Sequence, residues 1–468
     1  MNKLKIALLL IVLLLPFIWI KDGFEAIFLD LDTARDLHEL SNIWIGKIVW
    51  LGPDLSAGFH ASSLSYYIFY PALWISGGNA RSIIYFNMLL SLTALAWLGW
   101  LGIKKHKQVW LLAIAVIGLS PWWWKISLHP GNGDTYVIFL LAALTAIWFK
   151  KPFWLNSILL GVALALHPAA IFVLPILLYE AFLKKRGYLK NFFFILAGLI
   201  IPWAPNLIFI YITKGYWIRQ WLTKPSLVIE SSLDIKRNLN NITLMGKLSG
   251  LGTIGAAILW IFTGLAEQRN RLKVWYLIAL LSIIFFAFIS PMPDRYLYGI
   301  TAIASFIIII SLARKRWGWL ILLIVMLFLV INIFKGPLEV LKDPINISDD
   351  SQKTAERSIP MVENNIDVLI GKEQISKREK IAVLTALKPY GGITPQANDY
   401  RFFLRTKGYQ CLDVPDYSKA DLLIMFIEDP DFDWEEWRSW EIDQFREKEL
   451  RSITTVDKTR IVVFDKEE

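Results

Sequence analysis

Cysteine and histidine are the rarest residues in this chain of 468 residues, which contains one cysteine, Cys411, and five histidines. A single cysteine excludes an internal disulfide and any paired-cysteine site for zinc or redox chemistry. Histidines and carboxylates could together hold a divalent metal, but no HxxxH-type spacing supports such a site. We therefore expect the protein to work without a metal or another cofactor.

Charged residues are also scarce for a chain of this length. They make up 19% of the sequence, whereas hydrophobic residues make up 55%. Many segments of about 17–25 residues are apolar on every face, which is enough to cross a bilayer core of roughly 30 Å. The sequence therefore predicts a polytopic α-helical membrane protein. Its apolar runs lie at about 4–20, 82–102, 109–122, 135–149, 153–167, 168–183, 192–212, 248–266, 274–290, 297–313 and 318–334.

The net charge of +9 arises largely from short basic clusters between the apolar runs. Lysine and arginine mark the cytoplasmic side of a membrane protein, so the clusters explain the charge without nucleic acid as a partner. They alternate with longer, more aromatic connections, and they lie at 104–107, 150–151, 184–190, 267–273 and 313–316. We expect a multi-pass protein of the plasma (inner) membrane, with about 11 spans, a cytoplasmic N-terminus and an extracytoplasmic C-terminus.

The composition changes near Gly336 to that of an ordinary soluble protein. Three short apolar runs, 380–387, 422–427 and 460–464, predict buried strands, and residues 399–409 predict a helix between the first two. We therefore divide the chain into two parts. These are a transmembrane domain, 1–335, and a small extracytoplasmic α/β domain, 336–468.

The first outer loop, about 21–78, is too long for a simple link between two spans. Residues 32–49 can form an amphipathic helix, because apolar residues recur there at helical spacing. This apolar stripe consists of Leu37, Leu40, Trp44 and Ile48. Residues 64–75 are strongly aromatic, which is typical of a helix at the membrane interface. The stretch between these helices, 51–63, contains the Gly and Pro residues that stop helices.

Asp32 and Asp36 lie four residues apart on the first of these helices, so both carboxylates point the same way. Arg35, three residues from Asp32, can neutralise part of their charge. One explanation is local, because the helix dipole favours acidic residues in the first turn. The other is chemical. A carboxylate held near a membrane span, at the depth of the lipid headgroups, could act as a general base toward an acceptor hydroxyl.

Two motifs in this loop resemble those of a known group of enzymes. After an N-terminal span come DTARD (32–36) and LGPDLSAGFHASSLSYYIFYP (51–71), as in bacterial family-39-type glycosyltransferases of the GT-C superfamily. This group is related to protein O-mannosyltransferases and to the aminoarabinose transferases of lipid A. Ala61, Ser62 and Ser63 stand where relatives usually carry Gly-Pro-Leu, which is a departure from the pattern.

The resemblance implies a GT-C fold and an enzyme that transfers a sugar from a polyprenyl-phosphate donor to an acceptor on the outer face of the membrane. The reaction would be a direct, inverting displacement. In that family an acidic residue of the first outer loop is the catalytic base. Alignment of the motif gives this role to Asp32, with Asp36 next and Asp30 third. The sugar is left open, and so is the acceptor, which is a protein, a lipid or a polysaccharide.

The leaving lipid phosphate needs positive partners. Arg295 stands at the predicted outer end of a span, where the family often has an Arg-Tyr pair, and its planar fork suits phosphate oxygens. An ion pair between Arg295 and the neighbouring Asp294 is the simpler explanation. Lys125, in PWWWKISLHPGNGD, is the next candidate, and the tryptophans before it are expected to anchor the chain at the interface.

Two histidines complete the candidate site. His60 belongs to the family-like GFH stretch and could contact phosphate or acceptor. His167, in LALHPAAIF, lies where a span ends near the outer leaflet, and a lone polar residue in a span tends to mark function. The candidate substrate-binding residues are therefore Arg35, His60, Lys125, His167 and Arg295.

The main alternative is a lipid-linked sugar flippase or another transporter without transferase activity. Such a protein is expected to carry charges near the membrane midplane and paired, broken helices. The predicted spans are nearly free of charge, and their polar groups collect on one side. This pattern favours chemistry at an interface over passage through the membrane.

Overall fold

The structure is a computed structural model that describes only part of the chain. The described residues are 3–14, 31–54, 60–106, 108–183, 188–215, 235–288, 294–335, 359–387, 392–394, 397–433, 445 and 448–466. The side chains of Asp32 and Arg295 are outside the described set, and so is the whole of Asp30. Contacts divide the chain into two units, which are described separately. The helical unit comprises 1–21, 50–68 and 84–345, and the α/β unit comprises 22–49, 69–83 and 346–468.

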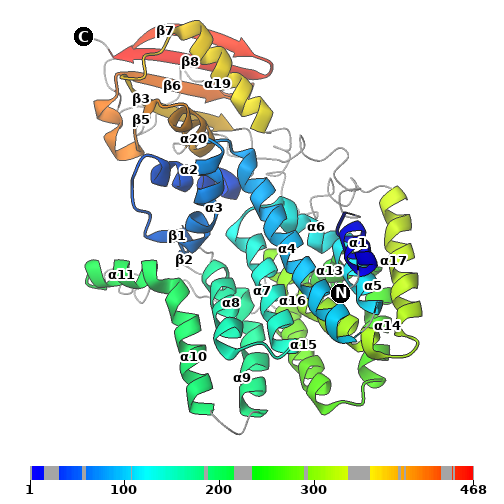
Figure 1. The fold of residues 1–468 in the computed structure, drawn as a ribbon. Coiled ribbons are helices and arrows are strands. Elements are labelled where there is room, and N and C mark those ends of the chain that lie inside the picture. Colours follow the sequence, from blue (N-terminus) through cyan, green and yellow to red (C-terminus); the bar gives the residue numbers. More distant parts are fainter. Residues whose placement is uncertain are drawn as a thin grey trace. The chain divides into compact units, whose positions relative to one another are not determined.

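The helical unit is built mainly from α-helices (Figure 1). Its first part also contains a small antiparallel hairpin, formed by β1 (Leu51–Asp54) and β2 (His60–Ser62). The α-helices of this unit are α1 (Lys3–Leu14), α4 (Arg81–His106), α5 (Val109–Leu119), α6 (Pro121–Leu128), α7 (Asn132–Trp148), α8 (Phe153–Leu166), α9 (Leu174–Leu183), α10 (Tyr188–Ile200), α11 (Ala204–Ile212), α13 (Ile235–Leu248), α14 (Gly252–Leu265), α15 (Asn270–Phe288), α16 (Asp294–Arg314) and α17 (Gly318–Lys335). Two short 3-10 helices, η2 (Pro168–Val173) and η3 (Ile201–Trp203), connect some of them.

Several of these helices fit a bilayer. Among the described residues, three helical segments are long and apolar enough to cross a bilayer: Arg81–Lys105, Leu189–Ile212 and Leu297–Arg314. The number of possible spans rises to five if each of two bent helix pairs is counted as one span. The first bent pair shows where a predicted span differs from the structure. The expected run at 109–122 ends at Leu119, and α6 turns away from α5 by 63°. The reason is local, because Pro121 disfavours helical geometry at Ser120, which adopts an extended conformation.

Helices α8 and α10 approach one another closely because small residues line their contact. A Cβ atom placed on Gly161 would collide with the carbonyl oxygen of Gly198, and one placed on Gly198 would collide with Ser157. Small residues at such positions let two membrane helices make backbone contact without a side chain between them.

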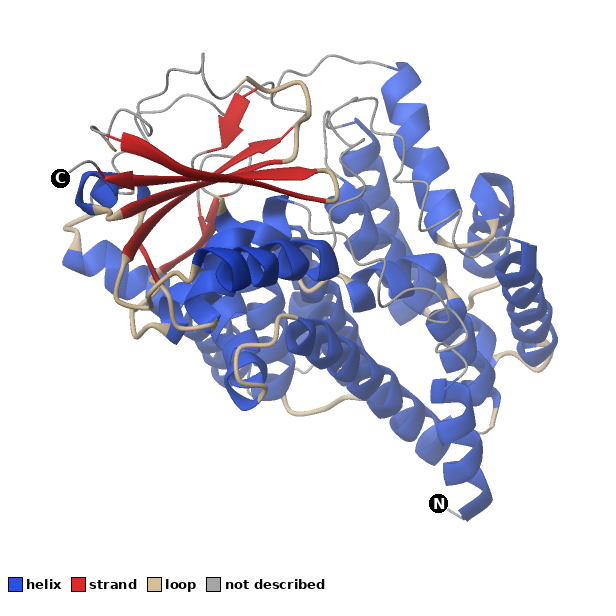
Figure 2. Cartoon of the chain, turned by 90° about the horizontal axis from the view of Figure 1, so that it is seen from above, coloured by secondary structure: helices blue, strands red, loops and turns tan. Residues whose placement is uncertain are grey.

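The α/β unit contains one mixed sheet with strand order β4-β3-β6-β8-β7, and β5 also pairs with β3 (Figure 2). The strands are β3 (Lys380–Leu387), β4 (Gly392–Thr394), β5 (Gln410–Cys411), β6 (Leu422–Ile427), β7 (Lys448–Val456) and β8 (Thr459–Lys466). The central pair β3–β6 is parallel, and β8 lies antiparallel to both β6 and β7. The three strands expected from the sequence are therefore present, and α20 (Asn398–Thr406) is the helix expected between the first two.

Both faces of the sheet are covered. On one face Phe426 stacks on Tyr400 of α20, with ring centroids 3.6 Å apart, and Asn365 of α19 (Ile359–Glu373) donates a hydrogen bond to the Tyr400 hydroxyl. On the other face Met425 and Phe464 pack with Tyr417 of the 3-10 helix η6 (Val414–Lys419). The alternation along β6 thus buries successive side chains on opposite sides of the sheet.

Helix α2 (Leu31–Trp44) belongs to the α/β unit, where it packs against α20. The predicted helix over 32–49 is too long at its C-terminal end. Gly46, with φ of 86°, ends the helix in a left-handed turn, in which Gly46 N–H donates to Ile43 O and Lys47 N–H to Asn42 O. The predicted helix at 64–75 is confirmed as α3 (Leu64–Ile75).

His38 of α2 is largely enclosed in the α/β unit, with 12% of its side chain exposed. Burial, together with the positive charges of Arg405 and Arg401, lowers its pKa from 6.5 to about 3. The folded protein therefore holds His38 neutral, whereas the unfolded chain binds a proton near pH 6.5. The stabilisation from His38 is complete above pH 6.5 and is lost progressively as the pH falls from 6.5 toward 3.

Replacing Gly161 by Ala is expected to separate α8 from α10 and to destabilise the folded protein by about 1–3 kcal/mol, because backbone faces backbone at this point. Thermal unfolding of the purified protein in detergent measures the change. Gly255→Ala in α14 is the matched control, since its added Cβ would meet only Leu251, at 3.5 Å. Equal melting temperatures for the two variants would contradict the close contact.

Acidification from pH 7.5 to 5 is expected to lower the melting temperature of the full-length protein, and the variant His38→Gln is expected to flatten that dependence. A single group that binds a proton only when unfolded changes the free energy of unfolding by up to about 1.4 kcal/mol per pH unit. His60→Gln serves as the control for histidine loss. If wild type and His38→Gln gave parallel curves between pH 6.5 and 5, the burial of a neutral imidazole would be disproved.

Candidate active site

The acidic end of α2 carries the predicted base residues. Asp36 is buried, and its Oδ1 accepts hydrogen bonds from Arg35 Nε (3.1 Å) and Arg35 Nη2 (2.9 Å). Arg35 thus pairs with its direct neighbour Asp36. Asp32 lies one turn earlier in the same helix.

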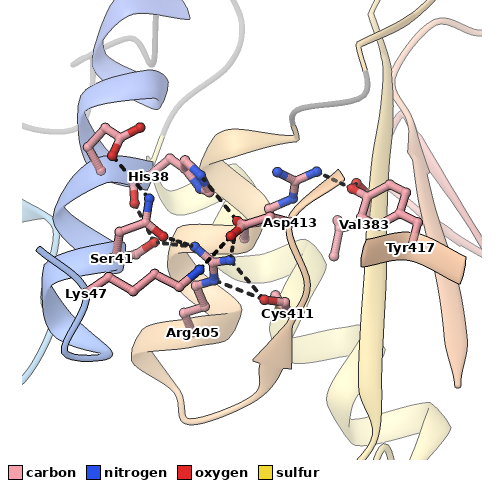
Figure 3. Close-up of polar contacts among 11 residues, drawn as sticks. His38, Ser41, Lys47, Val383, Arg405, Cys411, Asp413 and Tyr417 are labelled. Atoms are coloured by element: carbon pink, nitrogen blue, oxygen red, sulfur yellow. Dashed lines mark hydrogen bonds and ion pairs between the residues drawn. The ribbon is translucent and has the colours of Figure 1, made fainter. Parts of the chain in front are cut away.

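The opposite side of α2 is bound by one guanidinium group, that of Arg405 in α20 (Figure 3). Its Nη1 donates to Asn42 Oδ1 (2.8 Å) and Ser41 Oγ (3.3 Å), both on α2. Its Nη2 donates to Cys411 O (2.9 Å) and Asp413 Oδ1 (2.8 Å), and its Nε also donates to Cys411 O. Only 1% of the Arg405 side chain is exposed, so these bonds replace its water.

Asp413, which pairs with Arg405, also contacts His38 of α2 and Lys47, which follows the helix. Lys47 Nζ lies 2.5 Å from Asp413 Oδ2, and His38 Nε2 lies 3.8 Å from Asp413 Oδ1. Burial alone would raise the pKa of Asp413, but the hydrogen bonds from Lys47 and Arg405 outweigh it and hold that pKa below its usual range. We call this set, Arg405, Cys411 and Asp413 with His38, Ser41, Asn42 and Lys47, the Arg405 network.

Neighbouring groups orient the acceptors of this network. Asn42 Nδ2 donates to Glu39 Oε2 (3.1 Å), which turns the amide oxygen toward Arg405. Ser41 Oγ donates to His38 O (2.6 Å) and so presents its lone pairs to the guanidinium. Burial raises the pKa of Glu39. The network is therefore a set of mutually oriented polar groups inside the α/β unit.

In the helical unit, His60 belongs to the hairpin β1–β2. Its Nδ1 lies 3.0 Å from Gly52 O, across the hairpin. Residues far along the chain hold strand β2, since Ser62 Oγ donates to Pro202 O (3.0 Å) and Asn206 Nδ2 donates to Ala61 O (3.0 Å). Ala61 and Ser62 are among the residues that depart from the family pattern, and both are buried here. Their small size suits this close packing.

Lys125 of α6 lies over the ring of Tyr298 in α16, with its Nζ 5.4 Å from the ring centroid. Arg295 is the second residue of the same helix, three residues before Tyr298. The tryptophans that precede Lys125 were expected to be interfacial anchors. Instead, Trp122, Trp123 and Trp124 are all buried within the helical unit, and Trp124 Nε1 donates to Gly118 O.

His167 separates α8 from η2 and is buried. Its Nδ1 accepts a hydrogen bond from Ala169 N–H (3.3 Å), and its ring stacks on Tyr136 of α7 at 4.7 Å. The Tyr136 hydroxyl in turn accepts from Gly299 N–H (3.0 Å). His167 and Lys125 are thus connected to consecutive residues of α16, Gly299 and Tyr298.

Sequence reasoning did not find Tyr136, Tyr298, Arg405 or Asp413. Tyr298 had a weak signal, because it stands three residues after Arg295 and so one helical turn away. The other residues have no local signal, because each has at least one partner far away in the sequence. Across the described segments, no three His, Cys, Asp or Glu side chains come together as a metal site. Metal independence stays a prediction.

Comparison with known proteins gives matches in structure only. The sequence matches no protein-family model and no curated protein. The apo crystal structure of ArnT from Cupriavidus metallidurans matches with a TM-score of 0.62 and 11% identity, over 98% of this chain and 97% of that one. The structure of the same protein bound to undecaprenyl phosphate matches with a TM-score of 0.58 and the same identity and coverage.

At this identity the match establishes the fold, and it does so over nearly the whole chain. The fold that the DTARD and LGP…GFH motifs indicated is thereby confirmed: over nearly its whole length this chain has the fold of ArnT.

Proposed function

We propose that this protein is a membrane glycosyltransferase that transfers a sugar from a polyprenyl-phosphate donor to an acceptor hydroxyl on the outer face of the membrane. The observation that carries the proposal is the match over 98% of the chain to ArnT, one structure of which holds undecaprenyl phosphate. The bilayer, the lipid-linked donor and a protein, lipid or polysaccharide acceptor are its partners.

The reaction is a single inverting displacement. The base removes the proton of the acceptor hydroxyl, whose oxygen attacks the anomeric carbon of the sugar. The bond between that carbon and the phosphate oxygen breaks, and the lipid phosphate leaves with the bonding electrons. No cofactor is consumed, so the atoms balance between donor and acceptor alone.

We assign the general base to Asp32, with Asp36 as the second candidate. The contacts of Asp36 support this order, because Arg35 donates two N–H groups to its Oδ1. An oxygen engaged in this way has less capacity to accept a proton from a hydroxyl. Asp36 and Arg35 would then orient the acceptor.

Lys125 and Arg295 are assigned to the leaving phosphate, with His167 and His60 as further contacts. The placement of Lys125 over Tyr298, one turn from Arg295 on α16, supports a shared role for the two cations. Two positive charges near the departing oxygen stabilise the negative charge that develops on the phosphate. In this proposal the C-terminal residues 336–468 and the loop at 21–78 lie outside the cytoplasm.

A flippase or transporter is the rival function, and the distribution of charge argues against it. Within the described part of the helical unit, an ion pair joins Arg271 to Glu180, at 2.5 Å. Arg271 is the second residue of α15, and Glu180 lies in the last turn of α9. Both stand beside predicted cytoplasmic clusters, away from the midplane where transporters place coupling charges.

Asp32→Asn is expected to lower sugar transfer at least 100-fold, because a general base contributes about 10²–10⁴-fold to the rate. Purified wild type and variant are incubated with a panel of radiolabelled polyprenyl-phosphate sugars, and labelled acceptor and released sugar are counted. Binding of the lipid donor is expected to persist. Asp367→Asn is the control, since Asp367 is exposed and pairs only with Lys407 among the ion pairs described. Undiminished turnover of Asp32→Asn would refute the base assignment.

A further inference from the structure

The two aspartates of α2 and the residues that contact the Arg405 network occupy different sides of the helix. At 3.6 residues per turn, Asp32 lies about 40° around the helix axis from Asp36, whereas His38, Ser41 and Asn42 lie about 120–160° away from it. The Arg405 network binds this second group. The carboxylate positions are therefore on one side of α2 and its attachment to the α/β unit is on the other.

The contacts of Arg405 favour one register of α2 along its axis over a register shifted by one turn. A slip of α2 by one turn would move it by about 5.4 Å. Leu37 or Ile45 would then replace Ser41, and His38 or Gly46 would replace Asn42. None of these residues offers a side-chain oxygen, so the buried guanidinium would lose both acceptors on α2. Arg405 would keep its bonds to Cys411 and Asp413, but its Nη1 would lose the two oxygens on α2 that accept its hydrogen bonds. An unsatisfied buried donor is unfavourable, so this contact favours the observed register over a slip of one turn.

Lysine cannot take the place of arginine here. Arg405 uses all three of its nitrogens, and the planar fork reaches α2 on one side and the segment Cys411–Asp413 on the other. An ammonium group is a single point of charge with three donors and no second arm. It could remain paired with Asp413, but it would not bridge the two segments in the same geometry.

We propose that Arg405 is a positioning residue for the transferase reaction: by bridging Asn42 and Ser41 to Cys411 and Asp413, it holds α2 at one rotation and one register, so that the carboxylates at 32 and 36 are presented in a fixed orientation. The proposal rests on the proposed function and adds to it a role for the C-terminal residues. Arg405 touches neither sugar nor lipid in this scheme. It acts through α2.

A second arginine contact in the same unit supplies the matched control. Arg81 is the first residue of α4, whose residues 81–83 belong to the α/β unit, and it pairs with Glu363 of α19. Its Nη2 lies 2.8 Å from Oε2 and its Nη1 lies 3.1 Å from Oε1. This pair also joins the segment 69–83 to the C-terminal residues, but it does not touch α2. Glu363→Gln therefore weakens an attachment of similar chemistry while the Arg405 network stays intact.

The kinetic experiment compares Arg405→Lys, Asn42→Ala, the double variant and Glu363→Gln in the full-length protein. A misplacement of about 1 Å can cost 10²-fold in rate, so kcat of Arg405→Lys is expected to fall about 10- to 100-fold with KM for the donor unchanged. The kcat of Asn42→Ala is expected to fall by less than that of Arg405→Lys. The kcat of the double variant is expected to fall no further than that of Arg405→Lys alone. Glu363→Gln is expected to stay within about twofold of wild type.

Asn42→Ala is the second variant in case Arg405→Lys does not fold, because it removes one contact with α2 and retains the pair between Arg405 and Asp413. Amide hydrogen exchange supplies an independent measure. In Arg405→Lys, exchange is expected to accelerate over residues 33–44, while residues 359–373 of α19 keep the wild-type rate. General unfolding of the unit would accelerate both segments and would count against a positioning role.

Three results overturn the inference: a kcat of Arg405→Lys within twofold of wild type, an equal loss in Glu363→Gln, or effects of Arg405→Lys and Asn42→Ala that multiply independently. Failure of the proposed function would look different. In that case the wild-type protein itself would transfer no sugar from any donor of the panel. The hydrogen-exchange experiment would still test the structural part of the inference, because an unchanged amide exchange rate of α2 in Arg405→Lys would refute its attachment by Arg405.

Discussion

The burial of one guanidinium group is the constraint on which the α/β unit depends. Arg405 is almost wholly removed from water, and a buried charge is tolerated only when acceptors replace its hydration. Those acceptors come from Asp413 and Cys411 near the end of the chain and from Ser41 and Asn42 near its beginning. The two ends of the sequence must therefore fold together, because neither satisfies the guanidinium alone.

This constraint explains why composition and contacts divide the chain differently. The change in composition near Gly336 reports where apolar runs stop, and it supports a boundary at 335/336 as a prediction from the sequence. Contacts assign 22–49 and 69–83 to the same unit as 346–468. The hydrogen bond between Arg405 and Ser41 joins residues 364 positions apart. No periodicity or local motif carries information over such a separation, so sequence reasoning could not find it.

Elements whose cause is local were predictable. The strand at 422–427 is buried on both faces and consists of consecutive apolar residues, and α3 begins and ends where its aromatic run does. The end of α2 could also have been predicted locally, because a glycine such as Gly46 is the usual residue at a left-handed helix end. The apolar stripe continues to Ile48 and concealed this signal. The hairpin at 51–62 was missed for another reason, since Pro202 and Asn206 hold it from elsewhere in the chain.

The fold alone does not determine the chemistry, because one architecture can host several functions. A TM-score of 0.62 at 11% identity describes the backbone, and function has to be argued from the charged groups placed on it. Helix α2 is informative in this respect. A helix that merely covered a surface could be held by apolar contacts, which adapt to small shifts and cost less to bury than a charge. Here a network of oriented polar groups binds one side of α2, and the two aspartates of the motif occupy positions on the other side. Such precision is expected where the direction of a carboxylate matters, as it does for a base that must meet one hydroxyl proton.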